Sequence, residues 1–280
     1  MIRFVCRGNA LLAVLLAVLP SVLLPGLPAP AQAADETLAQ AVAGPWRTAR
    51  FAERDRYRHP LQTLEFFGLR PDQTVVEIWP AAGWYMEILA PYLHDRGKYY
   101  AAIPAADVPG ASREDKAAER LVRERMAADP AHFGKVIVSE LHPPQRTEIC
   151  PAGSADLVLT FRNVHNWMYG GYAQAAFDAF YAALKPGGIL GVEEHRARPG
   201  TSEAQMIKSG YVTEAYVKAL AAHAGFHFQA ASSVNANPRD TKDYPGGVWT
   251  LPPVLREGQK DRAKYLAIGE SDRMTLRFVK

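Results

Sequence analysis

The residues best suited to chemistry come directly after a short apolar segment, in the run Arg162-Asn163-Val164-His165-Asn166-Trp167. Amide, imidazole and indole groups at the end of a strand lie where an open α/β sheet binds its ligands. An imidazole titrates near neutral pH, so His165 is a candidate general base, with Asn163 beside it. A structural alternative stays open, because His165 and Asn166 could instead cap a helix that starts near Gly171.

A second group of ionisable side chains, Glu193-Glu194-His195-Arg196, ends another apolar segment. Strand alternation sends Glu193 and His195 to one face and Glu194 to the other, so these three side chains are not expected in one pocket. We interpret His195 as a candidate for substrate contact. A strand end held by salt bridges is the alternative.

Metal binding and cysteine chemistry are not expected. His223 and His227 have the spacing of ligands on a helix, but Gly225 ends that helix between them, so the two imidazoles would not share a face. No nucleophile motif surrounds Cys150, which indicates a loop or core thiol.

The segment from Thr74 to Tyr85 gives the most direct indication of a ligand site. Its apolar run, small-residue turn and following helical pattern predict a strand, a ligand-binding turn and a helix. Such a turn lies at the carboxyl edge of a parallel sheet, where open α/β folds bind nucleotides. The ligand is therefore expected to be nucleotide-like.

Three motifs resemble those of class I S-adenosylmethionine-dependent methyltransferases. They are Val75-Val76-Glu77-Ile78 with the turn that ends at Gly83, then Asp156-Leu157-Val158-Leu159, then Leu184-Lys185-Pro186-Gly187-Gly188, in the order that family uses. A narrower resemblance, to a bacterial group of predicted exported methyltransferases, rests on Arg58-His59-Pro60, Glu77 to Tyr85, residues 162–167 and Gly191 to Arg196.

The resemblance implies S-adenosylmethionine as cofactor and methyl transfer to an unidentified small acceptor. The cofactor-binding residues that it implies are Glu77, Trp79, Pro80, Ala81, Ala82, Gly83, Trp84, Tyr85, Arg162 and Asn163. The substrate contacts that we expect are Asn166, Trp167, His195, Tyr211 and Trp249.

The sequence departs from the family pattern in two places. Ala81 and Ala82 stand where the turn usually has glycines, and a left-handed alanine costs on the order of 1 kcal/mol, about tenfold in affinity. The second strand ends at Ile103-Pro104 without the acid that would accept both ribose hydroxyls. Either Asp107 turns in, or the ribose is held otherwise, or the site is degenerate.

Two alternative functions have to be weighed against methyl transfer. A degenerate site would make the chain a ligand-binding or scaffold protein that kept the fold and lost turnover. A nicotinamide-dependent oxidoreductase would need a G-x-G-x-x-G turn for the pyrophosphate, and the turn from Pro80 to Tyr85 contains only Gly83.

Residues 1–33 have the order of a secretory signal peptide. Arg3 and Arg7 precede an apolar stretch from Ala10 to Leu24, and Ala31-Gln32-Ala33 is a small-residue cleavage site. We expect cleavage after Ala33, export to a bacterial periplasm and no stable membrane insertion afterwards. Cleavage would lower the net charge from +3 to +1, so nucleic acid is not an expected partner.

Residues 34–280 are predicted to form one domain of class α/β. Alternating strands and helices predict a seven-stranded, mostly parallel sheet with helices on both faces. The resemblance implies that this sheet is Rossmann-like and that its last strand forms an antiparallel C-terminal hairpin. Residues 34–70 are expected to be a helical N-terminal cap, broken near Gly44-Pro45 and His59-Pro60. Many Pro, Gly and Asn residues predict a long, lid-like loop over residues 232–258.

The predicted element boundaries follow from hydrophobic periodicity. The strands are expected at Thr74–Trp79, Lys98–Ile103, Lys135–Ser139, Ala155–Thr160, Ile189–Glu194, Phe226–Ala231 and Met274–Val279. The helices that separate them are expected at Trp84–Leu93, Arg113–Ala128, Tyr172–Leu184 and Tyr211–Ala224.

Overall fold

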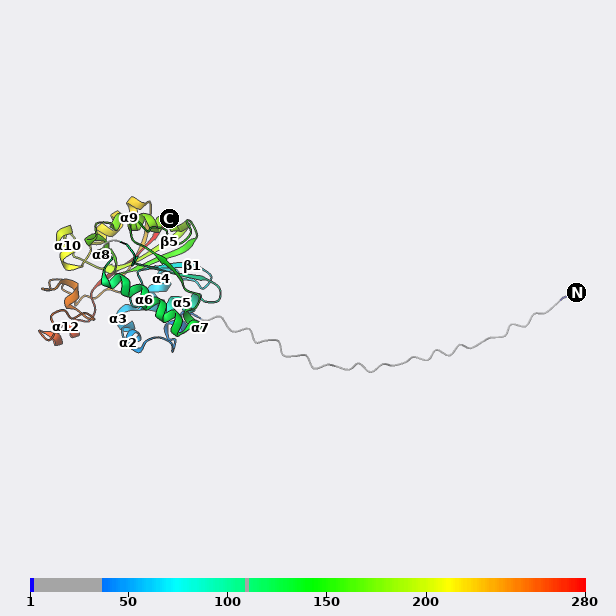
Figure 1. The fold of residues 1–280 in the computed structure, drawn as a ribbon, viewed down its shortest axis with the longest axis horizontal. Coiled ribbons are helices and arrows are strands. Elements are labelled where there is room, and N and C mark those ends of the chain that lie inside the picture. The colour runs from blue at the N-terminus through cyan, green and yellow to red at the C-terminus, as the bar shows by residue number, and fades with distance from the viewer. Residues whose placement is uncertain (3–36, 109–110) are drawn as a thin grey trace. The chain divides into compact units, whose positions relative to one another are not determined.

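Seven strands form one sheet in the order β3-β2-β1-β4-β5-β7-β6 (Figure 1). Strands β1 to β5 pair in parallel, and β7 lies antiparallel between β5 and β6. The predicted α/β fold, with a mostly parallel sheet and an antiparallel C-terminal strand, is confirmed. The strands are β1 (Thr74–Ile78), β2 (Lys98–Ile103), β3 (Ile137–Glu140), β4 (Ala155–Phe161), β5 (Leu184–His195), β6 (His227–Ser232) and β7 (Arg273–Val279).

The computed structural model describes residues 1–2, 37–108 and 111–280. Met1–Asp35 and Glu36–Lys280 are separate units, and the sheet belongs to the second. The apolar stretch and the cleavage site of the expected signal peptide lie outside the described residues. In the part of the chain that is described, no helix has the length and apolar character needed to cross a membrane.

Helices cover both faces of the sheet, with α8 and α9 on one side and α5 and α6 on the other (Figure 1). The helices are α1 (Leu38–Val42), α2 (Ala49–Ala52), α3 (Asp55–Arg58), α4 (Pro60–Phe67), α5 (Met86–Leu93), α6 (Arg113–Ala128), α7 (Pro130–Phe133), α8 (Val164–Tyr169), α9 (Ala173–Ala183), α10 (Glu203–Ser209), α11 (Glu214–Ala224), the 3₁₀ helix η1 (Gly247–Thr250) and α12 (Arg262–Ile268).

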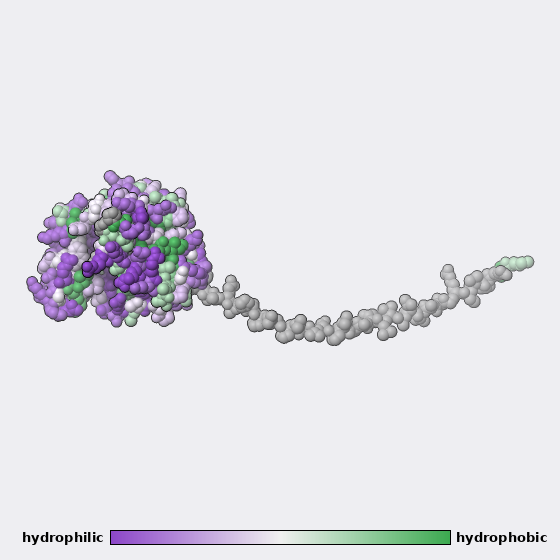
Figure 2. Space-filling model, in the orientation of Figure 1, coloured by the Kyte–Doolittle hydropathy of each residue, from purple (hydrophilic) through white to green (hydrophobic). Residues whose placement is uncertain are grey.

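Two hydrophobic cores, one on each face, follow from strand alternation. Val76 and Ile78 of β1 pack with α8, α9 and α11, whereas Val75 packs with α1, α4, α5 and α6. Figure 2 shows a mostly hydrophilic face with smaller apolar patches, and the exposed apolar side chains include Tyr169, Phe228 and Val254. Burying both sheet faces explains why the parallel strands are almost continuously apolar.

The N-terminal segment is helical and broken where the sequence predicts. Helix α1 ends at Val42, before Gly44-Pro45, and His59 separates α3 from α4 with a left-handed backbone (φ 41°). Pro60 then occupies the first position of α4, where its missing N–H has no cost.

Several short helices were not predicted, and one of them changes the interpretation of the site. Residues 164–169 form α8 instead of a loop, and the helix predicted from Tyr211 begins only at Glu214, after the separate helix α10. Both α8 and α10 have fewer than two full turns, which is too short for hydrophobic periodicity to reveal them.

The strand order places a topological switch point between β1 and β4, because the chain leaves β1 toward β2 and later returns to its other side. Open α/β sheets bind ligands in the crevice at the carboxyl ends of such strands. The segments that follow β1 and β4 are Trp79 to Tyr85 and Arg162 to His165, which are the two segments that the sequence singles out.

Candidate functional site

A buried amide links the two segments of the switch point. Asn163 Nδ2 donates to the carbonyl of Ile78, the last residue of β1, at 2.8 Å, and lies 3.3 Å from Thr160 Oγ1. Asn163 is also the residue before α8. This bond holds the start of α8 against the end of β1, so Asn163 has a positioning role.

Glu194, near the end of β5, organises the start of α8. Its Oε2 accepts from the backbone N–H of Val164 at 2.7 Å, and its Oε1 accepts from the backbone N–H of His195 at 2.7 Å. Oε1 also lies 3.1 Å from Nδ1 of His165. A buried carboxylate at a helix N-terminus is favoured by the helix dipole and by the free N–H groups there.

This contact gives His165 a defined chemical state. A carboxylate beside Nδ1 favours the tautomer with the proton on Nδ1, which leaves the Nε2 lone pair free to accept a proton. The same arrangement of base and orienting carboxylate is used in general-base catalysis. The alternative that His165 caps a helix near Gly171 is wrong, since His165 lies inside α8 and α9 begins at Ala173 without a side-chain cap.

His195 lies beside His165, with ring centroids 5.4 Å apart. Its Nδ1 is 2.6 Å from Ser271 Oγ, so its Nε2 is the atom left for other contacts. Burial, together with the nearby His165 and Arg162, holds the pKa of His195 well below its usual value, so the ring is neutral near pH 7.

The expectation that Glu194 and His195 point to opposite faces is corrected by this geometry. Both side chains lie near His165, because β5 ends at His195 and alternation no longer determines where its side chain lies. Glu193 does follow the expected alternation: it accepts from Tyr85, just before α5, and lies 3.5 Å from Asn235 Nδ2, in the loop after β6.

His165, Glu194 and His195 could together face a metal ion, since one ligand atom from each lies within 4.8 Å of the others. Glu194, however, already accepts from three backbone N–H groups and contacts the His165 ring. A helix-capping carboxylate with four donors has little capacity left for a cation. The expectation that the chain holds no metal stays a prediction.

The turn after β1 has a left-handed backbone at alternate residues. The φ angles are 49° at Trp79, 52° at Ala81 and 84° at Gly83. The departures from glycine that matter are therefore Trp79 and Ala81, and the expectation for Ala82 is corrected, because its φ is not positive. Non-glycine residues in this conformation cost about 1–3 kcal/mol each and cluster at functional sites.

The Trp79 side chain extends along the carboxyl edge of the sheet. Its Nε1 donates to the carbonyl of Leu141, just after β3, at 3.0 Å, and its ring meets Trp167 edge-on at 5.8 Å. Since β2 lies between β1 and β3, the indole passes over the end of β2. This is where the resemblance would place a ribose.

The acid that could replace the missing ribose acceptor does not turn in. Asp107 is exposed, with its side chain 69% accessible, and its Oδ2 lies 3.5 Å from Nη2 of Arg146. Asp107 therefore points away from the end of β2, where Ile103 and Pro104 are buried, and Glu140, which pairs with Ile103, is bonded to Arg146.

Glu77 is buried inside β1 and accepts a hydrogen bond from the Tyr99 hydroxyl. Burial raises the pKa of Glu77 to about 7, against the opposing effects of Tyr99 and Arg162. A carboxyl group that is half protonated near neutral pH is typical of functional sites, although buried structural networks show the same shift.

The other predicted residues of the turn differ in exposure. Pro80 and Gly83 are buried, whereas Ala81 and Ala82 are exposed. Trp84 donates from Nε1 to the carbonyl of Phe51 at 2.9 Å, which anchors the N-terminal helices.

Tyr85 is a second anchor at the same place. Its ring stacks on Phe161 at 3.6 Å between centroids, and its hydroxyl donates to Glu193 Oε2 at 3.2 Å. Trp84 and Tyr85 therefore pack beneath the turn and hold its backbone in position.

Trp167 belongs to the hydrophobic core. It is fully buried against Phe177 and Phe180, which is a packing role in place of the expected substrate contact. Its Nε1 is buried and has no hydrogen-bond partner among the described residues. Asn166, the next residue toward the N-terminus, is exposed on the outer side of α8.

The long loop over residues 232–258 is ordered by buried polar contacts. The Tyr211 hydroxyl lies 3.0 Å from both carboxylate oxygens of Asp240, so Tyr211 anchors the loop. Trp249 in η1 is half-buried, and its ring lies 6.0 Å from that of His165. Of the loop residues expected to contact substrate, Trp249 is the one beside the candidate base.

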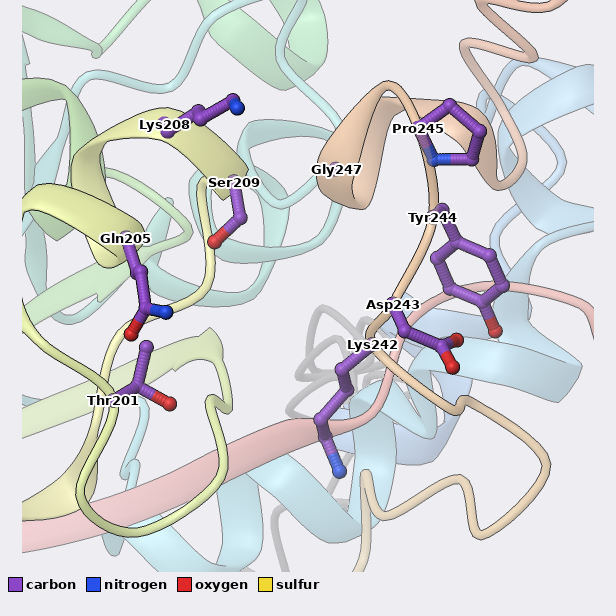
Figure 3. Close-up of a pocket in the computed structure, with 9 residues that line it drawn as sticks. All are labelled: Thr201, Gln205, Lys208, Ser209, Lys242, Asp243, Tyr244, Pro245 and Gly247. Atoms are coloured by element: carbon purple, nitrogen blue, oxygen red, sulfur yellow. The ribbon is translucent and has the colours of Figure 1, made fainter.

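A solvent-facing hollow of about 470 Å³ lies between this loop and α10. In Figure 3, Thr201, Gln205 and Ser209 stand on one side, and Lys242, Asp243 and Tyr244 stand on the other. Neither His165 nor His195 lines this hollow. It is therefore separate from the histidine cluster.

Sequence reasoning missed a buried ionic network on the other side of β5. Arg162 Nη1 donates to Glu193 Oε1 at 2.8 Å, and Arg273 Nη1 donates to Glu270 Oε2 at 3.0 Å. Arg58 joins the network through Glu270. The signal that could have revealed it is Arg58-His59-Pro60, which carries part of the narrower resemblance.

Comparisons with known proteins support the fold but no particular activity or substrate. No family model and no curated protein matches the sequence. A SAM-dependent methyltransferase from Aquifex aeolicus is similar in structure, with a TM-score of 0.52, 15% identity and coverage of 87% of this chain and 98% of its own. The [4+2]-cyclase SpnF has a TM-score of 0.51 and 16% identity, and covers 87% of this chain and 91% of its own.

A third similar structure is phosphoethanolamine N-methyltransferase 2 of Haemonchus contortus in complex with S-adenosyl-L-methionine. It has a TM-score of 0.51 and 16% identity, and covers 80% of this chain and 52% of its own. The fold of this protein is thus the Rossmann-like fold of class I methyltransferases. Because one similar structure is described as a cyclase, the activity must be argued from the site.

The backbone strain of the turn predicts opposite effects at two adjacent exposed alanines. Ala81→Gly should raise the free energy of unfolding by about 1 kcal/mol, because glycine removes the left-handed strain. Ala82→Gly should lower it by about 0.5 kcal/mol, because only the unfolded chain gains freedom. Denaturant unfolding of both variants checks this, and a loss of stability in both would contradict it.

Glu77 predicts a specific pH dependence of stability. Its folded pKa of about 7 exceeds the usual value of 4.5, so its protonated form stabilises the fold at low pH. That stabilisation is lost as the pH rises from 4.5 through 7, by up to about 3 kcal/mol.

Glu77→Gln should remove this dependence, because the amide does not titrate. The difference in unfolding free energy between the variant and the natural protein should therefore grow in favour of the variant from pH 5 to pH 8. Parallel stability curves would show that Glu77 titrates normally.

Proposed function

We propose that this protein is an S-adenosylmethionine-dependent methyltransferase that acts on a small molecule. The observation that carries the proposal is the contact between Glu194 and His165 at the switch point of a methyltransferase-like fold. That contact leaves the Nε2 of His165 free as a proton acceptor beside the crevice where this fold binds its ligands.

Within this proposal, the turn after β1 holds the cofactor. Left-handed residues at Trp79, Ala81 and Gly83 orient the backbone for close approach by a ligand, and the start of α5 follows directly. The cofactor supplies an electrophilic methyl group. The chain's own residues align the acceptor, exclude water and, for an acceptor with a poor nucleophile, remove its proton at His165 Nε2.

The nucleoside end of the crevice fits the cofactor less well. Ile103 and Pro104 offer no acceptor for ribose hydroxyls, and the Trp79 indole lies over the end of β2. The proposal therefore includes a movement of Trp79. Its indole would break the hydrogen bond to the carbonyl of Leu141 and leave space for the nucleoside at the end of β2. Glu77, Trp84 and Tyr85 act below the surface by holding the turn in place.

The same two features favour a second candidate function. If Trp79 stays in place and Asp107 stays paired with Arg146, the crevice is closed to a nucleoside. The chain would then be a ligand-binding or scaffold protein that has the fold without turnover.

Export to the periplasm is part of the proposal and rests on the order of residues 1–33 alone. The acceptor is then a small molecule that reaches that compartment, and His195 and Trp249 are the residues beside His165 that would contact it.

Calorimetry with S-adenosylmethionine, on natural protein and on Trp79→Gly, tests the proposal. Trp79→Gly removes both the left-handed strain and the indole over β2. Binding of the cofactor then no longer requires the free energy of moving that ring. We expect the variant to bind about tenfold more tightly, even though it loses core contacts and melts at a lower temperature.

The matched control is Phe226→Gly, which removes a buried ring that packs on Tyr181, between α11 and β6. It should lower the melting temperature without changing the affinity. Binding by neither the natural protein nor Trp79→Gly would favour the scaffold alternative. Weaker binding by Trp79→Gly would mean that the indole contacts the cofactor.

His165→Ala tests the general base. Methyl transfer, measured as release of S-adenosylhomocysteine with a panel of small acceptors, should fall by about a hundredfold while cofactor affinity stays nearly unchanged. Tyr169→Ala, an exposed residue of the same helix, should leave both properties unchanged. A parallel loss of cofactor affinity and thermal stability in His165→Ala would indicate a structural role only.

A further inference from the structure

The buried ionic network at the end of β5 contains more arginine than acidic residues. Four guanidinium groups surround two carboxylates: Arg54, Arg58 and Arg273 contact Glu270 at 2.7, 3.1 and 3.0 Å, and Arg162 contacts Glu193 at 2.8 Å. Arg273 Nε also lies 3.3 Å from Glu193 Oε1. These contacts leave two positive charges without a matching carboxylate.

Nearby acids remove at most part of this excess: Glu194, on the opposite face of β5, is held by backbone N–H groups and the His165 ring. Glu77 faces Arg162, but burial raises its pKa to about 7, so it carries only part of a charge. Asp272 is occupied by Arg196 and Lys242 at 2.7 and 2.8 Å. Uncompensated buried charge is costly, so the excess is unfavourable until an anion compensates it.

Several donors of the network have no acceptor. Among the described residues, Arg54 Nη2 is buried without a hydrogen-bond partner, and Arg273 Nε faces Glu193 Oε1 at 3.3 Å without forming a hydrogen bond. Within residues 37–108 and 111–280, the side chain of Arg58 makes a single hydrogen bond, from Nε to Glu270, and Arg162 uses its side chain only for the bond from Nη1 to Glu193.

Arg58 is held in a geometry that suits a planar anion. Its guanidinium lies over the Trp84 ring at 4.8 Å, and its side chain is only 5% exposed. Stacking on Trp84 and the hydrogen bond from Nε fix the plane of the Arg58 guanidinium. Nη1 and Nη2 then remain as a parallel pair of free donors. Such a pair matches the two oxygens of a carboxylate.

Arg162 is the second arginine of the network with free donor groups. It follows β4 with a left-handed backbone (φ 60°), so its side chain turns back toward β5, and its Nε and Nη2 have no partner among the described residues. Its side chain is 18% exposed, more than that of Arg58. The opening therefore lies on the Arg162 side, at the carboxyl edge beside Asn163.

We propose that Arg58 and Arg162 form a binding site for a ligand carboxylate, which compensates the charge excess of the buried network. The proposal deepens the proposed function, because the carboxylate belongs either to the amino-acid part of S-adenosylmethionine or to the acceptor. Arg162 follows β4 at the same carboxyl edge as His165, so the position suits both sources. A divalent cation is excluded at this place by the same excess of arginine.

Three probes separate the two sources: S-adenosylmethionine, 5′-methylthioadenosine, which has the same nucleoside without the amino-acid carboxylate, and acetate. Each is titrated into natural protein, Arg58→Gln and Arg162→Gln, with binding followed by calorimetry and by thermal shift. We expect acetate to raise the melting temperature of natural protein and to have at least about thirtyfold weaker affinity for both variants.

If the carboxylate comes from the cofactor, both variants should lose at least about thirtyfold in affinity for S-adenosylmethionine and keep their affinity for 5′-methylthioadenosine. If it comes from the acceptor, both nucleosides should bind the variants as they bind natural protein, and only acetate binding should be lost. Either result supports the site and names its ligand.

Arg47→Gln is the matched control. Arg47 also stacks on Trp84, at 5.2 Å, but its two terminal nitrogens already bind Asp55 and the carbonyl of Val42. It should lose stability without losing acetate binding. Where Arg58→Gln or Arg162→Gln fails to fold, Arg58→Lys and Arg162→Lys keep the charge and remove the paired donors.

Unchanged acetate affinity in both arginine variants would overturn the proposal, as would equal loss in Arg47→Gln. Inorganic phosphate that binds more tightly than acetate would overturn the choice of a carboxylate. Acetate binding that depends on Arg58 and Arg162, without binding of either nucleoside, would uphold the site and contradict the methyltransferase function.

Discussion

Two adjacent carboxylates at the end of β5 determine how the rest of the site is arranged. Glu194 accepts the N-terminal N–H groups of α8 and orients His165, whereas Glu193, on the opposite face, accepts from Arg162 and Tyr85. Both side chains are fully buried, so each needs its partners to offset the cost of desolvation. The end of β5 therefore connects the histidines, through Glu194, with the face covered by α8, and the arginines, through Glu193, with the opposite face.

The sequence was sufficient for the sheet and for the neighbouring positions of the two segments proposed for the site, because both depend on local pattern. Apolar runs and turn residues define β1 and β4, and their order along the chain places Trp79 and Arg162 at one crevice. Contacts between distant residues could not be predicted in this way. Asn235 meets Thr63 and Glu193, far away in the chain, and nothing in the local pattern of either segment indicates this.

The same limit explains the errors at single residues. Trp167 was expected at a substrate surface because it follows a strand, yet α8 turns it into the core. His195 was assigned to one face by alternation, which no longer applies where the strand stops. Of the two alanines named for the turn, Ala81 has the left-handed backbone, and Trp79 was not foreseen, since composition shows where glycine is missing but not which residue has positive φ.

The turn and the arginine network together constrain what a ligand must be. The Trp79 indole reaches from the end of β1 to Leu141, across the end of β2 where the proposed function places the nucleoside. At the other end of the proposed site, Arg58 and Arg162 present free donors in a setting with excess positive charge, which an anion matches best. A ligand that occupies both ends of the proposed site would therefore displace an aromatic ring and supply a negative charge. A neutral nucleoside meets only the first demand, which is why the charge, more than the nucleoside, is expected to govern affinity in this crevice.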